Sequence, residues 1–165
     1  TFHTKPDPED RANRYIAHGD MSDPYIRMLG AEFIKHGRQQ KAIMRVADTK
    51  FPGMKPAGDQ FEMMEEWYSF KDYRDDLHVL LVQETEGANE PIYTRPAFPA
   101  TWVRKHGKGR VFYTSMGHRE DVWTNPIFQS ILSGGIDWAL SRVDAKIPAN
   151  IKKAAPGFAV IPPKG

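Results

Sequence analysis

The stretch from residue 101 to residue 141 constrains the fold most, because its first half predicts a strand hairpin. Residues 101–104 favour a short strand. Residues 105–109, which contain two glycines, favour a tight turn. Residues 110–116 favour a second strand, since β-branched and aromatic residues are concentrated there. These two strands should therefore pair with each other.

A helix should follow this hairpin. Asn125 is a good N-cap and Pro126 a good first helical residue. Apolar residues then recur at spacings of three and four, which predicts one apolar face; they are Phe128, Ile131, Leu132, Ile136, Ala139 and Leu140. His118 lies between strand and helix, just past the carboxyl end of a strand, where α/β proteins place their chemistry.

Further elements are indicated upstream. Asp23 and Pro24 predict the start of a short helix over residues 24–29. Residues 30–37 read as a loop or short element. Residues 41–47 alternate as a strand does, and residues 61–70 favour a strand through their aromatic residues. Residues 78–83 are apolar on both faces, as in a central buried strand.

Composition limits the classes of function. A chain of 165 residues corresponds to one domain. It has no cysteine, which excludes disulfides, thiolate zinc sites and a cysteine nucleophile. The net charge of +2, with basic residues scattered along the chain, argues against a nucleic-acid partner. No apolar run reaches membrane-spanning length, which argues against a membrane partner.

The run WVRKHGKGRVFYTSMGH, residues 102–118, followed by a helix ending in GGIDWAL, resembles the carboxyl-terminal part of the ThuA-like family, named for trehalose utilisation. The most specific part is the Gly-Lys-Gly-Arg-Val-Phe-Tyr…Gly-His pattern. Shorter upstream matches are GAEFIKHG, EEWY, HVLLVQET and the Pro-x-x-Trp entry to the hairpin. The resemblance covers about residues 1–142.

The resemblance implies an α/β fold, a three-layer flavodoxin-like sandwich similar to class I glutamine amidotransferases. It also implies that an N-terminal half with parallel strands and crossover helices is missing or comes from a partner subunit. A homo-oligomer is a separate expectation. Residues 1–142 are then the C-terminal portion of a ThuA-like domain, and residues 143–165 a proline-rich tail acting as an arm or linker. Phe51-Pro52 stands where the family often has His-Pro, so no role of that histidine is expected.

The resemblance further implies a role in bacterial carbohydrate metabolism, with a small-molecule sugar as partner. The expected substrate is a disaccharide such as trehalose or a keto-sugar, processed by a hydrolase, lyase or isomerase through acid/base chemistry. Without cysteine the chain cannot be a glutamine amidotransferase. Two alternatives remain: a non-catalytic sugar-binding or scaffolding module, or one segment of a larger assembly. Family members occur both in the bacterial cytoplasm and as periplasmic or secreted forms.

His118 is the leading catalytic candidate, as general acid/base or as metal ligand, since imidazole titrates near neutrality. The alternative is a histidine that hydrogen-bonds a loop carboxylate. Glu65 and Glu66 should point to opposite faces of a strand, so at most one serves a cleft. We choose Glu66 as the carboxylate that orients a histidine or holds a sugar hydroxyl. A solvated carboxylate pair is the alternative.

Three residues are candidates for substrate binding. They are His36, which the resemblance places at the same cleft, and Tyr68 and Trp123, whose flat rings suit a sugar. Their alternatives are a surface histidine and core or rim aromatics. His36 and His118 with a carboxylate could also hold a divalent metal such as zinc or manganese, although no His-x-x-x-His spacing supports it. No Gly-x-Ser-x-Gly motif suggests a serine nucleophile.

Overall fold

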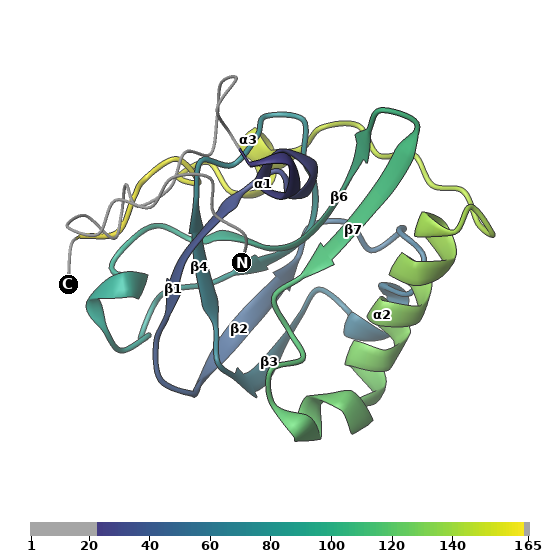
Figure 1. Cartoon of the computed structure of the whole chain (residues 1–165). Coiled ribbons are helices and arrows are strands. Elements are labelled where there is room, and N and C mark those ends of the chain that lie inside the picture. The colour runs from purple at the N-terminus through teal and green to yellow at the C-terminus, as the bar shows by residue number, and fades with distance from the viewer. Residues whose placement is uncertain (1–22, 164–165) are drawn as a thin grey trace.

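The computed structural model describes residues 23–163 of the chain (Figure 1). Strands dominate it, and three short 3-10 turns (η2–η4) interrupt the loops. The other elements in chain order are α1 (Pro24–Leu29), β1 (Glu32–His36), β2 (Gln40–Val46), β3 (Gln60–Glu65), β4 (Tyr68–Lys71), β5 (His78–Gln83), β6 (Phe98–His106), β7 (Gly109–Thr114), α2 (Pro126–Ala139) and α3 (Ile151–Ala154).

The strands form two sheets. A five-stranded sheet has the order β3-β2-β5-β6-β7, and β1 pairs with β4 in a separate ribbon. In Figure 1 this ribbon lies at the left of the larger sheet and α2 at its right. The predicted α/β class is confirmed. Every strand pairing within residues 23–163 is antiparallel, so the parallel strands expected of a three-layer sandwich are not among the described ones.

β5 occupies the centre of the larger sheet, between β2 and β6. All six of its residues are buried, as the apolar character of both faces predicted. Among the described residues, the largest fully buried side chains are Trp67, Trp102 and Trp138. Within residues 23–163, no helix is both long and apolar enough to cross a membrane.

The predicted hairpin and the start of the following helix are confirmed. β6 and β7 pair from Thr101↔Thr114 to His106↔Gly109. The side chain of Asn125 accepts hydrogen bonds from the backbone N–H groups of Ile127 and Phe128, and Pro126 is the first residue of α2.

The predicted apolar face of α2 is partly wrong, because Ile136 and Leu140 are exposed. The buried stripe is Phe128, Ile131, Gly134, Gly135 and Trp138. Two glycines in this stripe allow that face of α2 to pack against the core. A Cβ on Gly135 would lie 2.5 Å from the ring of Phe112 on β7, and a Cβ on Gly134 would lie 2.1 Å from the carbonyl oxygen of Pro52. Glycine contributes no side chain to a hydrophobic pattern, so the pattern alone pointed to the wrong face.

Residues 61–70 are strand, as predicted, but they form two strands in different sheets. β3 ends at Glu65 and β4 begins at Tyr68. Trp67, at the break, is fully buried and donates its indole N–H to the carbonyl of Gln40. Residues 32–36, expected within a loop or short element, form β1, which pairs with β4.

The described part of this predicted tail, residues 143–163, contacts the core, which differs from the expected arm or linker. Ile151 of α3 is 1% exposed. Asn150 hydrogen-bonds both backbone groups of buried Val79 in β5. Its Oδ1 accepts from the Val79 N–H at 2.6 Å, and its Nδ2 donates to the Val79 carbonyl at 3.0 Å. Arg95 donates to the carbonyl of Phe158 further along. The prolines stop regular structure, but the segment still packs on the core.

Candidate functional site

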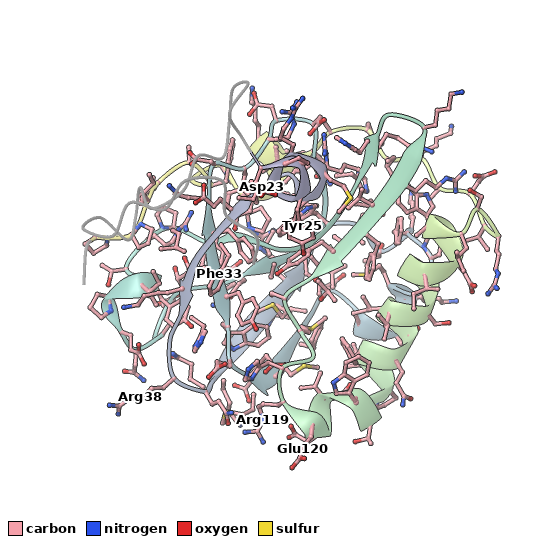
Figure 2. The ribbon with its side chains drawn as sticks, in the orientation of Figure 1. Asp23, Tyr25, Phe33, Arg38, Arg119 and Glu120 are labelled. Atoms are coloured by element: carbon pink, nitrogen blue, oxygen red, sulfur yellow. The ribbon has the colours of Figure 1, made fainter. Side chains whose placement is uncertain are left out.

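Four predicted site residues come together at one end of the two sheets. His36 is the last residue of β1, Glu66 follows β3, Tyr68 opens β4, and His118 lies in the loop after β7. Figure 2 shows Arg38, from the turn after β1, and Arg119, from the loop after β7, at this same lower end of the molecule. Their elements meet because β1 pairs with β4, and the chain crosses from β3 to β4 at Glu66.

One carboxylate joins the two histidines. The Nε2 atom of His118 lies 3.0 Å from Oε2 of Glu66, and the Nδ1 atom of His36 lies 3.4 Å from Oε1 of the same residue. The imidazole centroids are 6.2 Å apart. Glu66 is 16% exposed, and each histidine side chain is 44% exposed. The predicted pairing of Glu66 with a histidine is therefore geometrically present, with two histidines instead of one.

This geometry fixes the tautomers of the neutral imidazoles. A ring nitrogen that faces a carboxylate carries the proton, so the other ring nitrogen holds a lone pair. Nδ1 of His36 also lies 3.1 Å from the carbonyl oxygen of Gly37, another acceptor. The lone pairs are therefore on Nδ1 of His118 and Nε2 of His36. Neither atom has a hydrogen-bond partner among the described residues.

Tyr68 lies beside both histidines, with its ring centroid 5.9 Å from His36 and 6.2 Å from His118. Burial raises the pKa of its hydroxyl, and the charges of Glu66 and Glu65 raise it further. The hydroxyl therefore stays protonated and can donate a hydrogen bond to a bound molecule.

Glu65 holds the loop that carries His118, a role that the sequence did not reveal. Its carboxylate is fully buried. Oε2 accepts the backbone N–H groups of Gly117 at 2.8 Å and His118 at 3.0 Å. Oε1 accepts those of Arg119 at 3.0 Å and Glu66 at 2.8 Å. Glu66 lies just past the end of β3, so the strand alternation expected for the two glutamates does not apply to it. Both glutamates contact His118: Glu66 contacts its ring and Glu65 accepts its backbone N–H.

Trp123 lies apart from the other four residues. It is 53% exposed, packs edge-on against Phe128 of α2, and donates its indole N–H to the carbonyl of Gly117. No ring contact among the described residues joins it to His36, Tyr68 or His118. It supports the shape of the loop, whose Gly117 has a φ of +105° that disfavours a side chain.

The described residues contain no group of three or more His, Cys, Asp or Glu side chains arranged to hold a metal ion. His36 and His118 each direct one nitrogen at an oxygen of Glu66. This arrangement places each imidazole within hydrogen-bonding distance of the carboxylate.

Two hollows border the histidines. A cavity of about 480 Å³ lies on the side of His36 and Tyr68. A second, of about 370 Å³, is lined by His118 together with Gln39, Arg119, Glu120 and Asp121. Arg119 spans this second hollow, since it bonds both Asp121 and the side chain of Gln39. The imidazoles are thus accessible to a small molecule from either side.

Comparison with known proteins agrees with this architecture. A ThuA-like protein from Bacteroides uniformis ATCC 8492 has a similar structure, with a TM-score of 0.60 and 20% identity, over 80% of this chain and 58% of that chain. A ThuA-like protein from Parabacteroides merdae ATCC 43184 has a TM-score of 0.50 and 20% identity, over 78% of this chain and 47% of that one. The chain thus spans about half the length of these solved relatives. No curated protein matches it significantly.

A family model also matches the sequence. It is described as ThuA, trehalose utilisation, and it aligns with residues 15–139, well over half of the chain. The match includes β1 to β7, the loop that bears His118, and all of α2. The chain therefore belongs to the ThuA family.

Proposed function

We propose that His36, Glu66 and His118 form an acid/base centre that acts on a sugar derivative in bacterial carbohydrate metabolism. The observation that carries this proposal is the sharing of the Glu66 carboxylate by two imidazoles, at 3.0 and 3.4 Å. A carboxylate that fixes a tautomer also stabilises the imidazolium formed when the other nitrogen takes a proton. The family's description, trehalose utilisation, supports a sugar as substrate.

The proposed chemistry is a pair of proton transfers. Nδ1 of His118 takes a proton from a carbon beside a ketone. The electron pair of the broken C–H bond forms a C=C bond, and the π electron pair of the carbonyl moves to the ketone oxygen. Glu66 stabilises the resulting imidazolium. His36, when protonated, returns a proton to an oxygen of the substrate through Nε2, so charge is conserved. General acid/base catalysis of this kind contributes typically 10²- to 10⁴-fold in rate.

Glu65 and Tyr68 would assist without transferring the proton themselves. Glu65 accepts hydrogen bonds from four backbone N–H groups, including those of His118 and Glu66. These bonds keep the side chains of His118 and Glu66 in a fixed position relative to each other. Tyr68 offers a neutral hydroxyl donor next to the imidazoles. The chain has no cysteine to attack an amide, so the amidotransferase reaction is not proposed.

A non-catalytic sugar-binding module is the second candidate, favoured by the aromatic lining of the larger cavity. Product analysis separates the two. The protein is incubated with trehalose, other disaccharides and their keto derivatives, and products are identified by NMR while calorimetry measures binding. Conversion that is lost in His118→Gln but kept in His106→Gln, an exposed histidine of the β6–β7 turn, supports the enzyme. Binding without conversion supports the module, and conversion that persists in His118→Gln contradicts the proposed mechanism.

A further inference from the structure

The larger cavity has a nearly continuous aromatic wall. Residues from α1, β1, β4 and β7 line it: Tyr25, Leu29, Phe33, His36, Tyr68, Phe70, Tyr113 and Thr114. Figure 2 shows Tyr25 and Phe33 on the same face of the molecule, on α1 and β1. The volume of about 480 Å³ falls in the range of small-molecule sites, about 300–1,000 Å³.

The rings of this wall support one another. Phe33 packs edge-on against Tyr68 at 4.9 Å between centroids, and Phe70 packs edge-on against Tyr113 at 5.4 Å. Tyr68 and Phe70 are 6.5 Å apart and connect the two pairs. Such rings have few rotamers to lose on binding, so they offer flat apolar faces at a low entropic cost. The apolar C–H face of a sugar ring suits this surface.

Two tyrosine hydroxyls contribute neutral polar groups to the cavity. The hydroxyls of Tyr68 and Tyr113 have no hydrogen-bond partner among the described residues, so both are available to a ligand. Burial raises the pKa of each, well above the usual value for Tyr113, so both remain donors. Thr114 is already engaged with Thr101 and with the backbone of Met116.

The described residues that line the cavity include no lysine or arginine. Of its eight lining residues only His36 has a basic side chain, and that imidazole already faces the Glu66 carboxylate. A phosphate or carboxylate group placed here would lose its hydration without a compensating cation, and Glu66 would repel it. An uncharged ring with hydroxyls meets no such penalty.

We infer that this aromatic cavity binds an uncharged sugar ring of the substrate and holds it against His36. The inference deepens the proposed function, on which it rests for the nature of the ligand. It assigns a neutral glycoside, and not a sugar phosphate or sugar acid, to the site. Phe33 and Tyr113 then determine specificity: Phe33 by stacking and Tyr113 by donating one hydrogen bond.

Binding of trehalose, its keto derivative and trehalose 6-phosphate to the full chain, measured by calorimetry and saturation-transfer NMR, tests the inference. We expect trehalose or its keto derivative to bind at least tenfold more tightly than the phosphate. Tyr113→Phe removes only a hydroxyl and should weaken binding about tenfold, the equivalent of about 1.4 kcal/mol. Phe33→Leu should weaken it further, whereas Ile136→Ala, on the exposed face of α2, should leave it unchanged.

Three results would overturn the inference. They are tighter binding of the phosphate, unchanged binding in both Tyr113→Phe and Phe33→Leu, and no binding of any of the three sugars. Loss of binding on Trp123→Ala alone would place the ring on the loop after β7 and also overturns it. The outcome is separable from that of catalysis. Binding that depends on Phe33 and Tyr113 without conversion supports the cavity and contradicts the enzyme. Conversion that is insensitive to both Phe33→Leu and Tyr113→Phe supports the enzyme and contradicts the assignment of the cavity.

Discussion

Replacing Glu65 by glutamine should loosen the loop that carries His118 while changing almost nothing in shape. Glutamine keeps one oxygen and puts an NH₂ group in place of the other. In either orientation of the amide, two backbone N–H groups would face a donor: those of Gly117 and His118, or those of Arg119 and Glu66. Two of the four hydrogen bonds are therefore lost.

The size of the effect follows from these contacts. A hydrogen bond to a charged group contributes about 1.5–3 kcal/mol, and the loop can partly rehydrate its freed amides. We expect Glu65→Gln to lower the free energy of unfolding by about 3 kcal/mol. In the proposed acid/base mechanism, the displaced His118 should also lower kcat by about tenfold or more, because misplacement by about 1 Å can cost about 100-fold.

Urea unfolding followed by tryptophan fluorescence measures the change in the free energy of unfolding, and hydrogen exchange of amides 117–119 by NMR measures the loosening of the loop. Glu62→Gln is the matched control. It lies on the same strand but is 53% exposed and paired with Lys41, so it should change stability by less than about 0.5 kcal/mol. If Glu65→Gln were as stable as the control, with unchanged exchange of these amides, the assigned anchoring role would be wrong.

Three further predictions concern the fold. Asn150→Ala should lower the free energy of unfolding, measured in urea, by about 2–4 kcal/mol, because two backbone groups of buried Val79 lose their partners. Lys152→Ala is the exposed control, and equal stability of the two variants would contradict the packing of α3 on β5. Gly134→Ala should lower the free energy of unfolding by about 3 kcal/mol, because its methyl group would clash with Pro52. Ser133→Ala, at an exposed position of α2, should leave stability unchanged. The same unfolding midpoint for both variants would refute the close contact between α2 and Pro52. Burial raises the pKa of Glu32 from 4.5 to about 7, against the opposing charge of Lys71. The stability that the protonated carboxyl contributes is therefore complete below pH 4.5 and is lost as the pH rises through 7. Glu32→Gln should remove up to about 3 kcal/mol of this pH dependence, and an unaltered pH profile of the free energy of unfolding would contradict this.

Local signals in the sequence predicted local structure well. The hairpin of β6 and β7 followed from its glycine turn and β-branched residues, and the start of α2 followed from Asn125 and Pro126. The central place of β5 followed from its two apolar faces. In each case the determinant lies within a few residues of the structure it specifies.

Features that depend on distant partners could not be predicted. Glu65 anchors amides 52 to 54 residues away, and nothing near Glu65 in sequence distinguishes it from a solvated carboxylate. Gly134 and Gly135 set the buried face of α2 through the elements they touch. The packing of residues 150–158 depends on Val79 and Arg95, far upstream.

The candidate site shows both cases. The resemblance to the ThuA-like family and the strand-end position indicated His36, Glu66, Tyr68 and His118, and the structure brings these four together. The sharing of one carboxylate by two imidazoles could not be foreseen, since it depends on how the loop after β7 meets the turn between β3 and β4. Trp123, chosen because its flat ring suits a sugar, packs edge-on against Phe128 of α2 and lies apart from the four.

Exchange of substrate protons with solvent tests the central claim most directly. The keto derivative of trehalose is incubated in D₂O, and ¹H NMR follows the signal of the proton beside the ketone. The protein should accelerate the loss of this signal, and His118→Gln should slow the exchange at least about 100-fold, while His106→Gln keeps the full rate. Equal rates for the protein and His118→Gln, or no acceleration over buffer, would contradict the assignment of acid/base chemistry to the centre formed by His36, Glu66 and His118.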